Sequence, residues 1–269
     1  MRKKLTALFL VCAALLTLAC GCAPKSKEPT AYIGIISAMD NEIDLLLKEA
    51  VIDRVDTVAD VEYHVGSLRG QPVVITRSGI GKIRAASGVT TMLNNYLISK
   101  VIFTGIAGGV ADEPQVLDEV IATRLVEHDY GILSIDGFEW RSGDPGFGNE
   151  PGVYYDCDPQ LIQLAYDAAV EIVGKDHVFK GTVATGDQFI ANSEYVQKLL
   201  SDYDAYACEM EGAAAAVVCI KYEIPFVVIR ALSDKADGNA HESYENFGDT
   251  AADNSSRIVL KMLDAIGGK

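Results

Sequence analysis

Short apolar runs that alternate with helical segments are the feature that most constrains the fold. Four runs rich in Val and Ile lie at 31–37, 101–104, 178–184 and 225–232, and helical patterns occur at 42–50, 82–97, 159–173 and 209–222. Strands that alternate with helices favour a sheet covered by helices on both faces. We therefore predict an α/β fold, a single domain with a mixed, mostly parallel sheet flanked by helices in three α/β/α layers.

Weaker patterns complete the predicted domain. We expect further strands at 61–68, 72–77, 116–126 and 205–208, a helix from Asn192 or Ser193 to Leu200, a loop over 143–152 and a final helix at about 251–266. In sheets of this class, ligands bind outside the carboxyl ends of the strands. The segments that follow the strands are therefore where we expect a site.

The N-terminal residues are typical of a bacterial lipoprotein leader. A basic start at 2–4 precedes an apolar run at 5–19 that is too short for a stable membrane span, and small residues then precede Cys20 and Cys22. We predict a signal peptide over 1–22 with lipidation at Cys22, or alternatively at Cys20, a tether over 23–30 and the folded domain over 31–269. The protein is then extracytoplasmic and is held to the membrane by its lipid alone. A plain signal peptide and a misassigned start codon are the alternatives.

Charge and cysteine usage exclude several classes of function. Acidic residues outnumber basic ones by 38 to 23, for a net charge of −15, which argues against a nucleic-acid partner. After the leader the cysteines are Cys157, Cys208 and Cys219, an odd number at wide spacing that indicates core residues rather than a disulfide framework. The four histidines show no metal-ligand spacing, so we predict neither a metal nor a cofactor.

Polar side chains gather where the predicted strands end. The five segments are Ser37–Glu42, Thr104–Gly109, Thr185–Ile190, Cys208–Glu211 and Arg230–Asp234. Taken singly, an acid such as Glu42 or Asp234 is more often a partner of a helix dipole, with a contribution of about 0.3–1 kcal/mol. Five such segments in one chain indicate a shared site.

Together these segments resemble one known family. With Ile33–Glu42, Ser78–Lys82, Thr104–Gly109, Thr185–Ile190, Glu209–Glu211 and Val227–Asp237, the chain is similar to the 5′-methylthioadenosine/S-adenosylhomocysteine nucleosidases within the purine nucleoside phosphorylase fold. The resemblance extends from Tyr32 to the final helix. It implies hydrolysis of the N-glycosidic bond in small adenine nucleosides, with release of adenine and a 5′-thio-ribose. 5′-Deoxyadenosine is a further candidate substrate.

The resemblance also implies a role for each site residue. Asp234 matches the acid at purine N7, Glu42 matches the base that activates water, and Glu211 matches the carboxylate that binds the ribose hydroxyls. Arg230 and Ser233 organise these groups. The implied substrate-binding residues are Ala38, Met39, Ile106, Ala107, Gly108, Phe189, Ile190, Glu209, Met210 and Tyr244.

Two further points follow from the resemblance. Ile106 stands where close family members often carry a serine, so any side-chain hydrogen bond there is absent. A homodimer is implied, in which a segment near His128–Tyr130 or the loop from Gly143 closes the partner's pocket.

The chemistry of the bond agrees with these assignments. An N-glycosidic bond breaks through a sugar cation, so a site needs an acid at the leaving group and a carboxylate near the anomeric carbon. For Asp234 to act as the acid near neutral pH, burial must raise its pKa.

Two alternative functions stay open. A phosphorylase would share the fold but use phosphate, although a carboxylate such as Glu42 beside the anomeric carbon would repel that dianion. A nucleoside-binding lipoprotein would need no acid and base.

Two glycine-rich segments have simpler readings than nucleotide binding. Ser78–Lys82 lacks the spacing of a phosphate loop and indicates a tight turn from strand to helix. The glycines of Thr104–Gly109 do not fit the dinucleotide-binding pattern.

Overall fold

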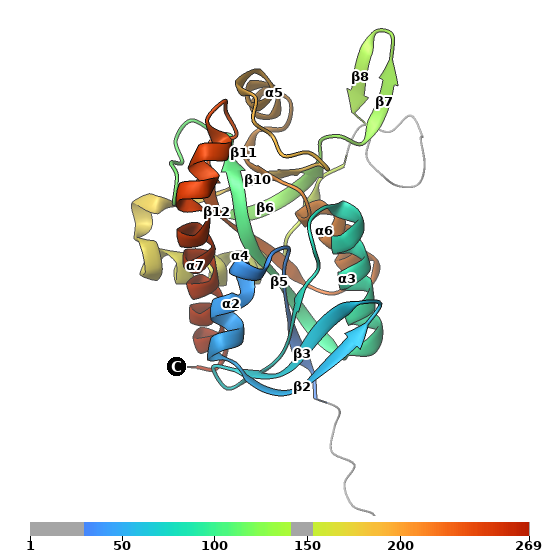
Figure 1. Cartoon of the computed structure of the whole chain (residues 1–269), viewed down its shortest axis with the longest axis vertical. Coiled ribbons are helices and arrows are strands. Elements are labelled where there is room, and N and C mark those ends of the chain that lie inside the picture. The colour runs from blue at the N-terminus through green and yellow to red at the C-terminus, as the bar shows by residue number, and fades with distance from the viewer. Residues whose placement is uncertain (1–29, 141–152, 269) are drawn as a thin grey trace, which may run out of the picture. The chain divides into compact units, whose positions relative to one another are not determined.

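A central sheet organises the domain in the computed structural model, which describes residues 30–140 and 153–268. The strands of this sheet are β1 (Tyr32–Ser37), β2 (Val51–Val58), β3 (Val61–Leu68), β4 (Gln71–Arg77), β5 (Ile98–Gly109), β6 (Glu119–Glu127), β9 (Tyr155–Asp156), β10 (Val178–Thr185), β11 (Ala205–Glu209) and β12 (Phe226–Asp234). Their order is β11-β10-β6-β12-β5-β1-β4-β3-β2, with β9 beside β6 (Figure 1).

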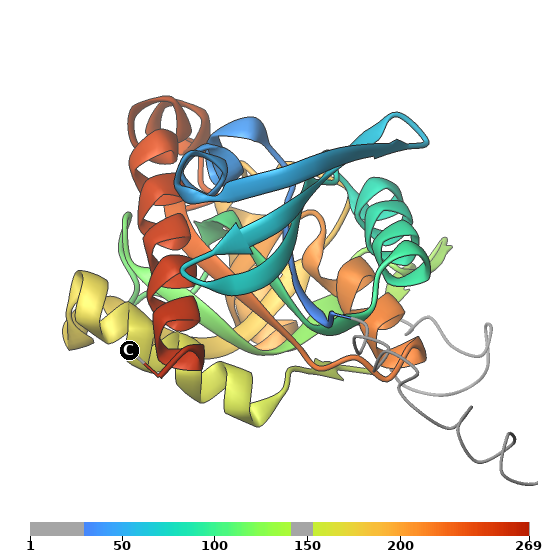
Figure 2. The same ribbon diagram turned by 90° about the horizontal axis from the view of Figure 1, so that it is seen from below.

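Helices cover both faces of the sheet. They are α2 (Asp40–Glu49), α3 (Lys82–Asn95), α4 (Pro159–Val173), α5 (Ser193–Tyr203), α6 (Gly212–Lys221) and α7 (Ala240–Ile266), with a 3₁₀ turn at Lys175–His177. Figure 2 shows α2, α4 and α7 on one side and α3 and α6 on the other. The predicted mixed sheet between helical layers is therefore confirmed.

The alternation of side chains along β1 explains the two layers. Successive residues of a strand point to opposite faces of a sheet. Ile35 packs in the cluster that includes α2, α4 and α7, whereas Ile36 packs in the cluster that includes α3 and α6. Strands that bury both faces read as continuous apolar runs, which is the pattern in the sequence.

Parallel and antiparallel pairings combine to close part of the sheet on itself. Parallel pairs join β1 to β4 and β5, β12 to β5, and β10 to β6 and β11. The end of β5 also pairs antiparallel with β11, where Gly108 lies opposite Cys208. Because β12 pairs with this same part of β5, Asp234 is also level with Gly108. The closure brings three strand ends to one place.

Several elements differ from the predictions. The segment 105–109, expected to be a loop after the strand at 101–104, is the end of β5, because its backbone pairs with both β11 and β12. Helix α7 begins at Ala240 rather than near 251. The strand expected at 116–126 begins at Glu119. The predicted loop at 143–152 and leader at 1–22 lie outside the described residues.

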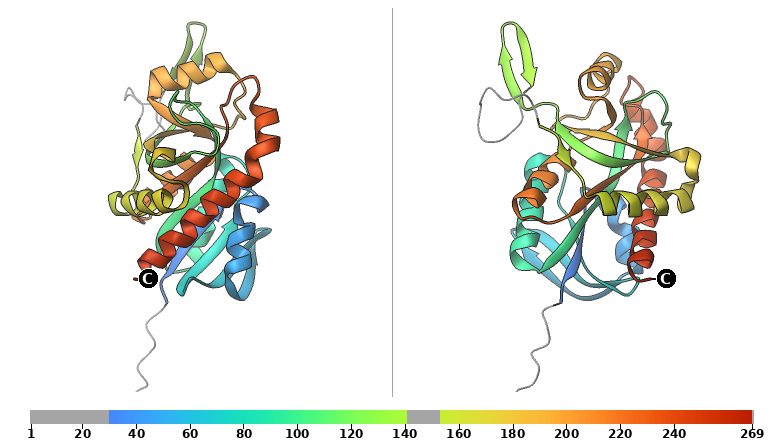
Figure 3. Two further views of the ribbon diagram at one scale, coloured as in Figure 1. Left: turned by 90° about the vertical axis from the view of Figure 1, so that its left-hand side faces the viewer. Right: turned by 180° about the vertical axis from the view of Figure 1, so that it is seen from behind.

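Four strands, β2, β7, β8 and β9, had no counterpart in the prediction. β9 has only two residues, and no residue of β2 or of the separate hairpin of β7 (Gly131–Ser134) and β8 (Gly137–Trp140) is fully buried. The hairpin extends away from the central sheet (Figure 3). Such strands bury too little apolar surface to produce a clear sequence pattern.

Two further predictions concern the cysteines and membrane-spanning helices. Cys157, Cys208 and Cys219 are free and buried, as predicted for core residues. Within the described part of the chain, no helix combines the length and apolar character needed to cross a membrane.

Candidate active site

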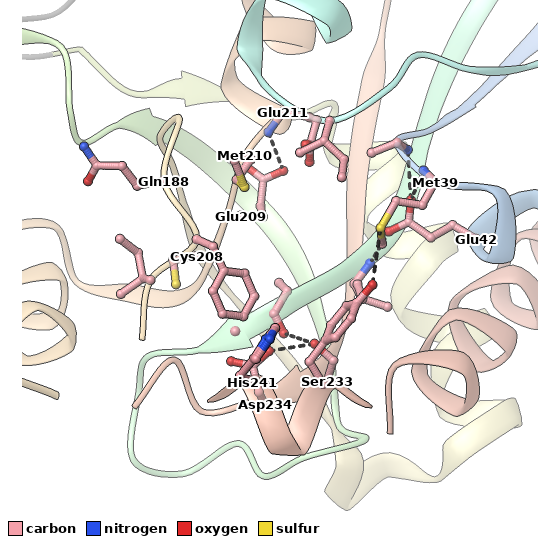
Figure 4. A pocket seen from close by; sticks show the side chains of 18 residues that line it. Met39, Glu42, Gln188, Cys208, Glu209, Met210, Glu211, Ser233, Asp234 and His241 are labelled. Carbon is pink, nitrogen blue, oxygen red and sulfur yellow. Dashed lines mark hydrogen bonds between the residues drawn. The ribbon is translucent and has the colours of Figure 1, made fainter. Parts of the chain in front are cut away.

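One cavity of about 370 Å³ opens where β1, β5, β11 and β12 end. It is lined by Ala38, Met39, Glu42, Ile80, Ile106, Ala107, Gly108, Gln188, Phe189, Ile190, Cys208, Glu209, Met210, Glu211, Ser233, Asp234, His241 and Tyr244 (Figure 4). Every predicted site residue except Arg230 is in this lining. Arg230 lies behind it, fully buried and bound to two of the carboxylates.

Glu42 is held at the start of α2 by three backbone donors. The N–H groups of Ala38 and Met39 donate to Oε2 at 2.9 and 2.8 Å, and the N–H of Ile106 donates to Oε1 at 2.9 Å. Burial raises the pKa of Glu42 above its ordinary value, while the charge of Arg230 and the three donors oppose that rise. The result is a fixed carboxyl group that is a stronger base than an exposed glutamate.

Arg230 is the cation that faces the buried carboxyl groups Glu42, Glu209 and Glu211. Its Nη2 forms an ion pair with Glu209 and lies 3.6 Å from Glu211 Oε2. Its Nε and Nη1 have no hydrogen-bond partner among the described residues. The guanidinium also lies over the ring of Phe103, with 4.8 Å from its carbon to the ring centroid.

The carboxylate of Glu209 is already bound within the protein. It accepts the backbone N–H of Glu211 at 3.1 Å and of Gly212 at 2.8 Å, together with the hydroxyl of Thr185 and the guanidinium of Arg230. The sequence placed Glu209 among the substrate-binding residues. It does line the cavity, but these contacts make its carboxylate a counter-charge for Arg230.

Glu211 has a different environment from Glu209. Its Oε1 accepts the backbone N–H of Gly81 at 2.8 Å. Burial, and after it the negative charge of Glu209, raises the pKa of Glu211 to about 7, although Arg230 and Gly81 favour its ionised form. Glu211 can therefore both accept and donate hydrogen bonds near neutral pH.

Asp234 ends β12 on the other side of the cavity. Its Oδ1 accepts the N–H of Ala236 at 2.7 Å, and its Oδ2 accepts the hydroxyl of Ser233 at 2.8 Å. Burial raises the pKa of Asp234, and these two hydrogen bonds only partly oppose it. A Cβ at Gly108 would lie 2.9 Å from Oδ1, so only a glycine at that position leaves room for this carboxyl group.

An aromatic group forms part of the cavity wall. The ring of Phe189 lies edge-on to those of His241 and Tyr244, at centroid distances of 6.1 and 6.3 Å. Tyr244 Oη lies 3.6 Å from the sulfur of Met39, and both residues pack against Ile106. With isoleucine here, position 106 offers the site a backbone N–H and an apolar side chain.

Sequence reasoning missed four residues of the lining: Ile80, Gln188, Cys208 and His241. The first three lie inside segments that had been singled out. His241 was missed because the first turns of α7 were not recognised as helix. Its spacing of three residues from Tyr244 is the signal that could have revealed it, since such residues share a helix face.

Metal binding has no support in this geometry. Across residues 30–140 and 153–268, no group of three His, Cys, Asp or Glu side chains could hold a metal ion.

Comparison with known proteins agrees with the site. The profile described as the phosphorylase superfamily matches residues 32–264. The 5′-methylthioadenosine/S-adenosylhomocysteine nucleosidase of Bacillus subtilis (strain 168) is 38% identical over 237 residues, which cover 87% of this chain and 99% of that protein. The chain belongs to this nucleosidase family.

Solved structures of the nucleosidase family have the same fold. The Helicobacter pylori enzyme, in complex with a pyrrolidine compound, has a TM-score of 0.78 at 31% identity and covers 88% of this chain and 100% of its own. The Neisseria meningitidis enzyme, in complex with methylthio-immucillin-A, has a TM-score of 0.76 at 34% identity, with coverage of 87% and 99%. The futalosine hydrolase of Helicobacter pylori is also similar, with a TM-score of 0.77 at 30% identity and coverage of 88% and 98%.

The close packing at Gly105 leads to a stability prediction for this nucleosidase. A Cβ at Gly105 would lie 2.5 Å from Glu42 Oε1 and would also strike Arg230 Nη1. We expect Gly105→Ala to lower the free energy of unfolding by about 1–3 kcal/mol, because a buried ionic cluster must shift. Urea denaturation measures the change.

Gly238→Ala is the matched control, because a Cβ there meets nothing within 4 Å. We expect it to change the free energy of unfolding by less than about 0.5 kcal/mol. Equal stability of the two variants would contradict the packing of Gly105 against Glu42 and Arg230.

Proposed function

We propose that the protein hydrolyses the N-glycosidic bond of 5′-methylthioadenosine and S-adenosylhomocysteine and releases adenine and a 5′-thio-ribose. The observation that carries this proposal is the convergence of Glu42, Glu211 and Asp234 on one cavity. The family membership supports it, because the relatives are named for these two substrates. A binding protein would have no need of an acid and a base in the same cavity.

Asp234 serves as the acid at the purine. Its raised pKa keeps a proton on the carboxyl group closer to neutral pH than in an exposed aspartate. The proton passes to N7 as the C–N bond breaks, so adenine leaves as a neutral base. The hydroxyl of Ser233 and the N–H of Ala236 fix the orientation of the carboxyl group.

Glu42 serves as the base that takes a proton from water. Arg230 Nη1 is beside it across Gly105, buried and outside the cavity lining. A water that donates to Glu42 is oriented by this fixed carboxylate, whose ionised form the charge of Arg230 favours. The oxygen then attacks the anomeric carbon, and Glu42 retains the proton.

Glu211 and Met210 bind the sugar between these two groups. A carboxyl group with a pKa of about 7 can exchange hydrogen bonds with two vicinal hydroxyls in either protonation state. We assign Phe189, Ile190 and Gln188 to the base and Met39, Ile106 and Tyr244 to the 5′ substituent, because all six line the cavity and the last three pack together.

The charges around the cavity favour water over phosphate. No lysine or arginine is in the described lining. Arg230 is matched by Glu209 and Glu211, and Lys82 is matched by Asp129 and Glu127 at 2.7 and 3.4 Å. A phosphate dianion beside Glu42 would find no unmatched cation to offset the repulsion.

The test is chromatographic detection of free adenine from each substrate, with and without phosphate. We expect the same rate in both conditions. Asp234→Asn should lower turnover by at least about 100-fold while substrate still binds in calorimetry, because the amide cannot supply the proton. Adenine release that requires phosphate would establish a phosphorylase, and unchanged turnover in Asp234→Asn would exclude this acid.

The dependence of kcat/KM on pH should be bell-shaped. Glu42 acts ionised, so activity is lost as the pH falls through its raised pKa. Asp234 acts protonated, so activity is lost as the pH rises through its raised pKa. A profile from about pH 4 to about pH 9 measures both limbs. Glu211, with a pKa of about 7, adds its own ionisation to this profile. Glu211→Gln should remove that ionisation and keep the limbs of Glu42 and Asp234 at a lower rate, and a flat profile in the wild type would contradict the two roles.

We further propose that residues 1–22 are a lipoprotein signal peptide and that Cys22, or alternatively Cys20, carries the lipid. Residues 23–30 then tether an extracytoplasmic domain to the membrane. The support is the leader sequence itself, because these positions lie outside the described residues. Incorporation of labelled fatty acid that is lost in Cys22→Ser tests this assignment, and retention in Cys22→Ser with loss in Cys20→Ser supports the alternative.

We also propose a homodimer. The hairpin of β7 and β8 extends from the sheet (Figures 1 and 3). It carries the exposed side chains of Leu133 and Ile135, which favour a partner surface. His128 is buried and Asp129 binds Lys82 of the same chain, so the hairpin that follows is the better candidate for reaching a second copy. The loop from Gly143 lies outside the described residues. Light scattering that reports a monomer would exclude the dimer.

A further inference from the structure

Helix α3 begins without a cap of its own. Its first turn contains no acidic residue. Its N-cap residue is Gly81, which has no side chain that could accept a hydrogen bond. The first backbone N–H groups of any helix lack partners within the helix. Here two distant carboxylates accept them: Glu211 Oε1 binds the N–H of Gly81 at 2.8 Å, and Asp187 Oδ1 binds the N–H of Lys82 at 2.8 Å.

The side chain of Lys82 extends the same set of contacts. Its Nζ lies 2.7 Å from Asp129 Oδ1, and Asp129 Oδ2 accepts the N–H of Asp187 at 2.8 Å. The three residues Lys82, Asp129 and Asp187 thus form a closed ring of hydrogen bonds, which we call the Lys82 ring. Within this ring, the side chains of Lys82 and Asp129 are mostly shielded from solvent, and each is 16% exposed.

Both members of the ion pair in this ring are charged. Burial opposes charge on each, but the hydrogen bond with Asp129 raises the pKa of Lys82, and the hydrogen bond with Lys82 lowers the pKa of Asp129. Charge-assisted hydrogen bonds are stronger than neutral ones, so the ring is a firm connection.

The ring fastens a loop that lines the cavity. Gly186 precedes Asp187, and a Cβ there would lie 2.5 Å from His128 Cε1 and 3.1 Å from Asp129 Cγ. The loop is therefore pressed against the end of β6. Its next residues, Gln188 and Phe189, are part of the cavity lining.

We propose that Asp187, acting with Lys82 and Asp129, is a positioning residue that fixes the purine-side loop and Glu211 to one common support, the start of α3. The proposal rests on the proposed function, because it assigns Glu211 to the sugar and Phe189 to the base. It also gives Ser78–Lys82 a purpose: its backbone donors bind carboxylates of the protein in the way that a phosphate loop binds phosphate.

The experiment compares two substitutions of Asp187 in steady-state assays of adenine release from 5′-methylthioadenosine. Asp187→Ala removes the acceptor for the Lys82 N–H, and we expect KM to rise about tenfold with kcat within about threefold of the wild type. Asp187→Asn keeps a side-chain oxygen at that position, so its KM should lie close to that of the wild type.

A shift in the pH profile distinguishes positioning from general damage. The Gly81 N–H favours the ionised form of Glu211. When Asp187→Ala loosens the start of α3, this donor moves away, so the pH dependence of kcat/KM that belongs to Glu211 should move to higher pH. Lys82→Met should produce the same shift. The double variant Asp187→Ala/Lys82→Met should change KM and the pH profile little more than either single variant does, because both substitutions break the same ring.

Asp158→Ala is the matched control. Asp158 caps α4 by accepting the N–H groups of Gln160 and Leu161 at 3.0 and 2.9 Å, and its own N–H binds Phe226 O at the far end of β12 from the cavity. We expect this variant to lower the unfolding temperature while KM and the pH profile stay unchanged.

The outcomes separate this inference from the proposed function. Wild-type protein that releases no adenine would exclude the function. Active wild type with an Asp187→Ala variant of unchanged KM and pH profile would overturn the positioning role alone. So would an Asp187→Asn variant as impaired as Asp187→Ala, or a Lys82→Met variant that retains the wild-type KM if Asp187→Ala fails to fold.

Discussion

The site depends on one buried arginine. Arg230 is fully buried on β12, lies over Phe103 and faces Glu209 and Glu211, with Glu42 across Gly105. Buried charges are costly unless they are paired, and removing one partner of such a pair typically costs about 3–5 kcal/mol. The carboxylates can therefore be gathered in an apolar cavity only because this guanidinium is there. The same contacts fix their positions, because Glu209 is taken up by Arg230, Thr185 and backbone N–H groups, while Glu42 and Glu211 line the cavity.

The partial closure of the sheet places the acid opposite this cluster. β5 pairs with β12 along its length and with β11 at its end, so Gly108 lies level with both Asp234 and Cys208. Only residues without a side chain allow such close approach: Gly108 makes room for Asp234, and Gly105 makes room for Arg230 and Glu42. The glycines in Thr104–Gly109 therefore serve the packing of charged groups around the end of one strand.

Much of the site could be predicted from the sequence, because its side chains lie directly after apolar strands and in segments shared with a family. The helix and strand alternation likewise gave the layers of the fold. Properties that depend on contacts between distant segments could not be predicted. The role of Glu209 as a counter-charge depends on Thr185 and Arg230, and the closure of β5 on β11 depends on register. The early start of α7 was hidden because residues 241–249 are mostly polar and only a few of them, such as Tyr244 and Gly248, face Ile106.

The division of labour between Glu42 and Asp234 follows from what surrounds each carboxyl group. Burial raises the pKa of both. For Glu42 the charge of Arg230 is the largest opposing effect, and three backbone N–H groups add to it, so one cation and three donors favour its ionised form against burial. Asp234 has only a hydroxyl and one N–H, and the nearby charge of Asp237 raises its pKa further. The two carboxyl groups thus share the effect of burial and differ in what opposes it: a cation and three N–H groups at Glu42, against a hydroxyl and one N–H group at Asp234. Because Arg230 is on the side of Glu42, the base belongs at the water and the acid belongs at the leaving purine.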